Sequence, residues 1–148
     1  TAPVFSASRS ANVSNVTGNG AVYTPVFDVA DVSSSGYNTS TGIFTVPAGE
    51  GGRYLFVFVI GLVAGGAAQV GGVIQLVTTG KTYRIDNNPY SLRNQASGVL
   101  SVTGAFIAQM SAGDTARINI TISGGPSNDA TFVGNNGFSS FAGYKLGV

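Results

Sequence analysis

The sequence predicts an all-β fold, built as a sandwich of two antiparallel sheets. Short segments rich in valine, isoleucine, phenylalanine, tyrosine and threonine alternate with clusters of glycine, serine and asparagine. No segment has the apolar periodicity of an amphipathic helix. Many short strands separated by turns are typical of sandwiches. Because 148 residues suit one compact unit and no stretch resembles a linker, we expect a single domain over residues 1–148.

Ten segments are predicted to be strands, and the turns between some of them can be identified. Thr78–Lys81 is expected to be a hairpin turn in which Gly80 has a positive φ, and Ser111–Asp114 fits the same description. The polar segment Asp86–Pro89 predicts an exposed loop. The predicted strands are Val4–Ser8, Val22–Ala30, Ile43–Val46, Tyr54–Ala64, Gly71–Thr79, Lys81–Ile85, Gly98–Gln109, Ala116–Ser123, Ala130–Val133 and Phe138–Leu146.

The segment Tyr54–Ile60 is apolar on both of its faces. Side chains alternate along a strand, so Leu55, Val57 and Val59 point away from the other four residues. One face of a sandwich strand packs on the opposite sheet, whereas the other normally meets water. We expect a subunit contact to cover the second face, because monomers rarely expose large contiguous apolar patches; burial within one chain is the alternative. The candidates for this interface or for the core are Tyr54, Phe56, Phe58, Ile60, Phe106, Phe138 and Phe141.

The composition argues against several classes of function. The chain has no histidine and no cysteine, so the commonest general base, the best nucleophile, disulfides and thiolate metal sites are all missing. Its six carboxylates are too dispersed to nominate a catalytic pair, and we predict no enzyme. The net charge is +1 without a basic stripe, so nucleic acid is not an expected partner. No apolar run reaches the roughly 18 residues of a membrane-spanning helix, so no membrane insertion is expected.

One polar segment with two tyrosines is the candidate for ligand binding. Tyrosine and arginine are enriched at recognition hot spots, and tyrosine rings also stack on sugars. The alternative is that both tyrosines simply pack at strand ends. The oxygen atoms of Asp86, Asn87 and Asn88 would allow a calcium site, but a solvated turn explains them better, and no metal or cofactor is predicted. The candidate ligand-binding residues are Tyr83, Arg84, Asp86, Asn87, Asn88, Tyr90 and Arg93.

Several segments resemble the globular heads of complement C1q and tumour-necrosis-factor-like proteins. The most specific are Tyr37–Pro47 and Gly52–Phe56, which match a tyrosine-asparagine turn, a threonine-glycine-x-phenylalanine-threonine strand, a proline, and then glycine-x-tyrosine-x-phenylalanine. Glu50-Gly51 lengthens the turn between them, and Ser140 stands where the family usually has glycine. The resemblance covers nearly the whole chain in the expected order. The other similar segments are Phe5–Arg9, Gly98–Leu100, Gly113–Ile118 and Phe138–Tyr144.

The resemblance implies a ten-strand jelly roll that forms a homotrimer. In such heads the first and last strands are adjacent at the base, where a collagen-like or other fibrous stalk often attaches. These heads usually bind their ligands through apical or lateral loops. The chemistry of these loops varies so much that the resemblance assigns no binding residue in this chain.

The function predicted from these observations is a non-enzymatic trimeric recognition or capping head of a larger fibrous or surface protein. Such a head would bind a protein or glycan receptor, outside the cell or on a virion surface, as part of a phage or bacterial appendage or of a secreted complement-like molecule. Two alternatives remain open. The chain would be a structural jelly roll that builds or decorates a capsid without a ligand, or a monomeric carbohydrate-binding module.

Overall fold

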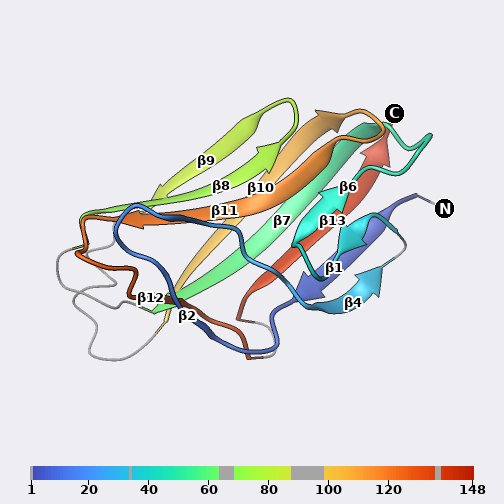
Figure 1. Ribbon diagram of the computed structural model, residues 1–148. Coiled ribbons are helices and arrows are strands. Elements are labelled where there is room, and N and C mark those ends of the chain that lie inside the picture. Colours follow the sequence, from blue (N-terminus) through green and yellow to red (C-terminus); the bar gives the residue numbers. More distant parts are fainter. Residues whose placement is uncertain (1, 34, 64–68, 88–98, 136–137) are drawn as a thin grey trace.

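The computed structural model describes residues 2–33, 35–63, 69–87, 99–135 and 138–148. Within these ranges every regular element is a β-strand, and the strands form two antiparallel sheets that face each other as a sandwich (Figure 1). The structure therefore confirms the predicted all-β sandwich. The described residues contain thirteen strands, because Val13–Thr17 and Tyr37–Asn38 were not predicted as strands and the predicted segment Val22–Ala30 falls on two.

The first sheet is built around one long strand, β7 (Gly52–Val63). β7 pairs with β10 along one edge and with β13 and β12 along the other. β13 pairs onward with β1, β1 pairs with β4, and β12 pairs with β2. The other strands of this sheet are β1 (Val4–Ser8), β2 (Val13–Thr17), β4 (Val29–Ser33), β10 (Leu100–Met110), β12 (Ala130–Phe132) and β13 (Ser140–Gly147).

The second sheet has the order β5-β6-β11-β8-β9, and β3 pairs with one end of β11. Its two central strands pair in unbroken register from Ala116 opposite Thr78 to Ser123 opposite Gly71. The strands are β3 (Val22–Tyr23), β5 (Tyr37–Asn38), β6 (Ile43–Thr45), β8 (Gly71–Thr78), β9 (Thr82–Asn87) and β11 (Thr115–Ser123).

The core lies between the sheets and is dominated by aromatic rings. The inward row of β7 is fully buried, as are the inward isoleucines of β11. Phe5 of β1 stacks on Phe44 of the opposite sheet at a ring-centroid distance of 4.9 Å and meets Phe141 edge-on at 5.0 Å. Apolar rings that close-pack in this way hold the two sheets together without disulfides.

Two inward positions are glycines because aromatic rings lie directly over them. A Cβ atom at Gly143 would overlap the Phe5 ring and crowd Phe56, and one at Gly104 would overlap Phe58. The missing side chains therefore let the rings lie flat against the backbone of β13 and β10.

The prediction of one strand over Val22–Ala30 is wrong. Residues 24–28 separate β3 from β4. Pro25 has no N–H group to donate to a neighbouring strand. The backbone of the buried Phe27 is hydrogen-bonded to the side chain of Tyr37 instead. The Phe27 N–H donates to the Tyr37 hydroxyl at 3.2 Å, and that hydroxyl donates to the Phe27 carbonyl at 3.2 Å. A side chain thus replaces a neighbouring strand here.

The hairpin predicted at Thr78–Lys81 joins β8 to β9, but Gly80 is not among the residues with a positive φ. The turn is closed by Thr78 instead. Its hydroxyl donates to the Lys81 carbonyl at 2.7 Å and accepts from the Lys81 N–H at 3.1 Å. Gly113 does have a positive φ, of 88°, at the second predicted turn.

The two chain ends lie at the same end of the sandwich (Figure 1). β1 and β13 are antiparallel neighbours, with Val4 opposite Tyr144, and the Lys145 N–H donates to the Pro3 carbonyl at 3.1 Å. We call this end the base. β7 begins at the base and runs to the far end of the molecule.

Candidate functional site

The outer surface of the first sheet carries two adjacent rows of mainly apolar side chains. Together the rows cover five strands in the order β10, β7, β13, β1 and β4, with the row nearer the base on the first four, and neither row contains a charged residue. We call these two rows the apolar face. The row nearer the base consists of Ile107, Leu55, Tyr144 and Val4, and the next row of Ala105, Val57, Ala142, Ser6 and Val32.

The larger side chains of the apolar face are well exposed in the single chain. The exposed fractions are 57% for Ile107, 52% for Val32, 51% for Tyr144 and 42% for Val57. Contiguous exposed apolar surfaces are typical of interaction sites, whereas a single exposed valine would need no explanation.

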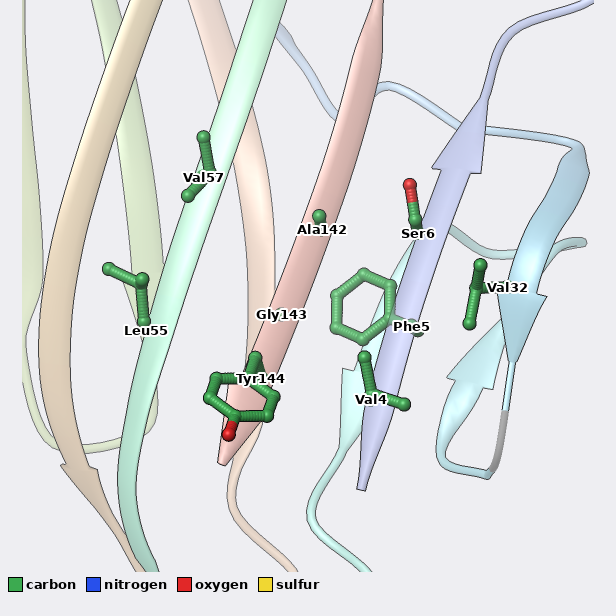
Figure 2. Close-up of a pocket in the computed structure, with 9 residues that line it drawn as sticks. All are labelled: Val4, Phe5, Ser6, Val32, Leu55, Val57, Ala142, Gly143 and Tyr144. Atoms are coloured by element: carbon green, nitrogen blue, oxygen red, sulfur yellow. The ribbon is translucent and has the colours of Figure 1, made fainter. Parts of the chain in front are cut away.

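The apolar face is hollowed over β13 and β1 into a groove of about 180 Å³ (Figure 2). Ala142, Gly143 and Ser6 form its floor because their side chains are short or absent. The larger residues stand around this floor, with Leu55 and Val57 on one side and Val32 on the other (Figure 2). The groove offers shape and apolar contact but no charged group.

Along the strands, the surroundings of the apolar face become more polar. Toward the far end, the next row contains Thr103, Ser140 and Ser8 beside Val59 and Val29. Toward the base, Lys145 pairs with Glu50 at 2.9 Å, and this hydrogen-bonded cation lowers the pKa of the Glu50 carboxyl. The pair ties the turn before β7 to the end of β13 and so fixes the base end of the face.

No protein-family model and no curated protein sequence matches the chain. Solved structures do. The globular domain of zebrafish complement 1qA matches with a TM-score of 0.66 at 19% identity, over 99% of this chain and 98% of that one. Murine APRIL matches with a TM-score of 0.63 at 16% identity, over 97% and 98%. PRD1 vertex protein P5 matches with a TM-score of 0.60 at 11% identity, over 98% and 97%.

The chain has the C1q/TNF-like jelly-roll fold. The match over nearly the whole of both chains confirms the resemblance seen in the sequence. Because the identities lie below 20%, these similarities establish the fold, and the binding chemistry has to be argued from this chain's own residues.

Most of the candidates for interface or core lie inside the jelly roll. Tyr54, Phe56, Phe58, Ile60 and Phe141 are fully buried between the sheets. The side of β7 that another molecule can reach is therefore the row with Leu55 and Val57.

The two remaining aromatic candidates lie at the margins of the core. Phe106 is partly buried and stacks on Phe58, with ring centroids 6.2 Å apart. Phe138, just before β13, is 48% exposed.

The candidate ligand-binding residues that the structure describes do not converge. Tyr83 faces inward, packs on Phe106 at a ring-centroid distance of 4.9 Å and donates its hydroxyl to the Ile107 carbonyl at 3.1 Å. Arg84 and Asp86 are exposed and form an ion pair with each other. Tyr83 thus packs at a strand, as the alternative interpretation proposed, and lies on the opposite face of β9 from its two charged neighbours.

The other ligand-binding candidates are only partly placed. Asn87 is the last residue of β9, so the predicted loop begins later than Asp86. Asn88, Tyr90 and Arg93 lie outside the described residues. The suggested calcium site includes Asn88 and stays a hypothesis. In the described part of the chain, no three histidine, cysteine, aspartate or glutamate residues form a group that could hold a metal ion.

The residues of the apolar face outside β7 were missed by sequence reasoning. Their signal was present, because Phe5 and Phe141 are strongly apolar and their immediate neighbours Ser6 and Ala142 must then point outward. The resemblance to C1q/TNF-like heads implied that the first and last strands are neighbours, as β1 and β13 are. What the sequence could not give was the pairing of β13 with β7 as well, which joins these short outward side chains into one surface. Within the same described ranges, no helix is long and apolar enough to cross a membrane.

Proposed function

We propose that this chain is a non-enzymatic head that associates with two further copies of itself through the apolar face. The head would form the recognition or capping end of a larger fibrous or surface protein, outside the cell or on a virion, with residues 1–148 as one domain. The observation that carries the proposal is the two-row apolar face, which crosses five strands without a charged side chain.

The exposed apolar side chains supply the free energy of association. Completely burying one valine, leucine or isoleucine side chain stabilises by about 1.5–3 kcal/mol relative to exposure. Ile107, Val32 and Val57 each retain roughly half of their surface for burial by a partner, and the Tyr144 ring adds more. Several such contacts per protomer offset the cost of association, whereas the separated chain would leave the whole face in water.

A threefold assembly is favoured by the fold. The sequence resemblance to C1q/TNF-like heads implies a homotrimer, and the jelly roll of this chain matches such heads over almost its full length. The apolar face independently supports self-association, since it was located from this chain's own residues.

The position of the chain ends supports the role of a head. Both ends lie at the base, so a stalk or a neighbouring part of the same protein would leave from there (Figure 1). The far end is then free for a receptor. There the Asn19 N–H donates to the Asn128 side-chain oxygen at 3.3 Å, which joins two polar turns from distant parts of the sequence. Such turns offer hydrogen-bonding groups to a protein or a glycan.

The assembly is tested by the native mass of the chain at micromolar concentration, measured by light scattering or native mass spectrometry. A trimer is expected. A monomer would reject the proposal and leave the monomeric carbohydrate-binding module as the better hypothesis.

Receptor binding needs a separate experiment. A glycan array and a cell-adsorption assay are run with the unmodified chain and with Tyr90→Ala and Arg93→Ala variants. Loss of binding in the variants, with the trimer intact, supports a recognition head that uses this segment. Binding to no surface tested would reject the recognition role.

A structural role in a capsid is the second candidate, because the fold also matches PRD1 vertex protein P5 along nearly the full length of both chains. In that case self-association is the whole function. The trimer would then form, no receptor would be retained, and assembly onto a larger particle would be the property to measure.

A further inference from the structure

We infer that the groove on the apolar face receives the Ile107 side chain of a second copy of this chain. The β10 edge of one protomer then packs over the β13, β1 and β4 strands of the next. This inference rests on the proposed self-association and specifies which surfaces meet.

The apolar face has a projecting part and a hollow part, and they lie on different strands. Ile107 is the most exposed large side chain of the face and stands on β10. The groove lies over β13 and β1, on the other side of β7 (Figure 2). Neighbouring strands are about 4.8 Å apart, so about 14 Å separates β10 from β1. A chain therefore cannot fill its own groove with its own Ile107, whereas a second copy can.

The groove suits an aliphatic side chain. Its walls are Val32, Val57 and Leu55, and its floor is kept low by Ala142. Interfaces gain most where an apolar side chain fills a pocket that excludes water. A polar or charged side chain would lose its hydration in this groove without gaining a charged partner.

The state of the two sheet edges indicates side-chain packing between copies rather than a shared sheet. The Ile107 carbonyl on the β10 edge already accepts a hydrogen bond from the Tyr83 hydroxyl at 3.1 Å. At the opposite edge, the pairing of β4 with β1 is interrupted by a register shift between Ser6 and Ala7. Such irregular edges disfavour continuous strand pairing between molecules.

A contact between two different patches of the same chain is head-to-tail, and it closes into a ring when the rotation between copies divides a full turn. The inferred contact is therefore compatible with the proposed trimer, in which each protomer gives one Ile107 and receives another.

The chain contains no cysteine, so a cross-linking experiment gives an unambiguous readout. The variant Ile107→Cys/Val32→Cys is treated with a short bis-maleimide and run on a denaturing gel, while native mass is measured before treatment. Covalent trimers are expected from the double variant. Each single variant should give no covalent trimer, because one cysteine per chain can link only two copies.

The matched control is Thr103→Cys/Val32→Cys. Thr103 is exposed on the same strand and face as Ile107, but four residues away, or about 13 Å along β10. Little cross-linking is expected from this control. A third variant, Ala142→Phe on the Ile107→Cys/Val32→Cys background, fills the groove and should abolish the covalent trimer.

The possible results separate this inference from the function on which it rests. The inferred contact is overturned if the native trimer links only through two Ile107→Cys positions, does not link at all, or still links when the groove is filled. In each of these cases the proposed trimer is unaffected. A native monomer overturns the proposed function. A native dimer that gives covalent dimers supports the contact and rejects the threefold assembly.

Discussion

Val57→Asp is the substitution that tests the apolar face most directly. Val57 lies on the central strand of the face, between Ala105 and Ala142, and retains 42% exposure in the single chain. An aspartate at this position remains hydrated in the monomer, so the jelly roll should fold with little loss of stability. In the trimer the same carboxylate is enclosed by apolar side chains and has no cationic partner in its row.

The expected effect on assembly is large. An uncompensated charge at a buried contact costs at least about 3 kcal/mol, and the trimer would contain three of them, for a total of about 9 kcal/mol. Since each 1.4 kcal/mol is a factor of ten, the trimer should be weakened by roughly six orders of magnitude. At micromolar concentration the variant should therefore be a monomer.

Light scattering after size-exclusion chromatography measures the assembly, and far-ultraviolet circular dichroism measures the fold. The control is Val22→Asp, which places the same change on β3 of the second sheet, where the valine is 62% exposed. This control should remain trimeric. A Val57→Asp variant that stays trimeric, or a Val22→Asp variant that dissociates equally, would refute the assignment of the contact to the apolar face.

Three further predictions concern the stability of the fold. Gly143→Ala should lower the free energy of unfolding by about 1–3 kcal/mol, measured by guanidinium denaturation, because the new methyl group overlaps aromatic rings of the core. Lys145 lowers the pKa of Glu50. The ionised carboxylate therefore stabilises the fold at pH values above its ordinary pKa, and this stabilisation is lost as the pH falls through the lowered pKa. Glu50→Gln should therefore flatten the acid side of the stability profile, and an unchanged profile would show that the pair contributes nothing. Burial raises the pKa of Tyr37 to about 12 from its ordinary value of 10.0. The folded protein should therefore keep its full stability below pH 10.0 and lose part of it as the pH rises toward 12. Tyr37→Phe should remove this alkaline loss and, because its hydroxyl bonds both backbone groups of Phe27, should cost about 1–3 kcal/mol at neutral pH.

Alternation along strands was the most informative signal in the sequence. It gave the bounds of β1 correctly as Val4–Ser8, and it separated the two rows of β7. Alternation alone cannot say which row faces the core when both are apolar. The structure resolves this through size, since the aromatic rings at Tyr54, Phe56 and Phe58 fill the space between the sheets and leave the smaller Leu55 and Val57 outside.

Features that depend on long-range pairing were harder to predict. β2 contains Asn15 with a φ of 60°, and its segment is polar, so only its pairing with β12 makes it a strand. The groove depends on four strands from separate parts of the sequence, which meet only through the order β7-β13-β1-β4. No local pattern in any one of these segments indicates a hollow.

Folding and assembly are governed by neighbouring residues that point in opposite directions. Gly143 faces inward beneath Phe5, whereas the adjacent Ala142 faces outward at the floor of the groove. Both positions require a small residue, but for different reasons: the first accommodates an aromatic ring of the same chain, and the second leaves room for a side chain of another copy. Enlarging Gly143 should thus destabilise the monomer, while enlarging Ala142 should leave the monomer folded and weaken only the assembly. If both substitutions lowered stability equally in monomeric protein, the groove would be a part of the core rather than a surface built for contact.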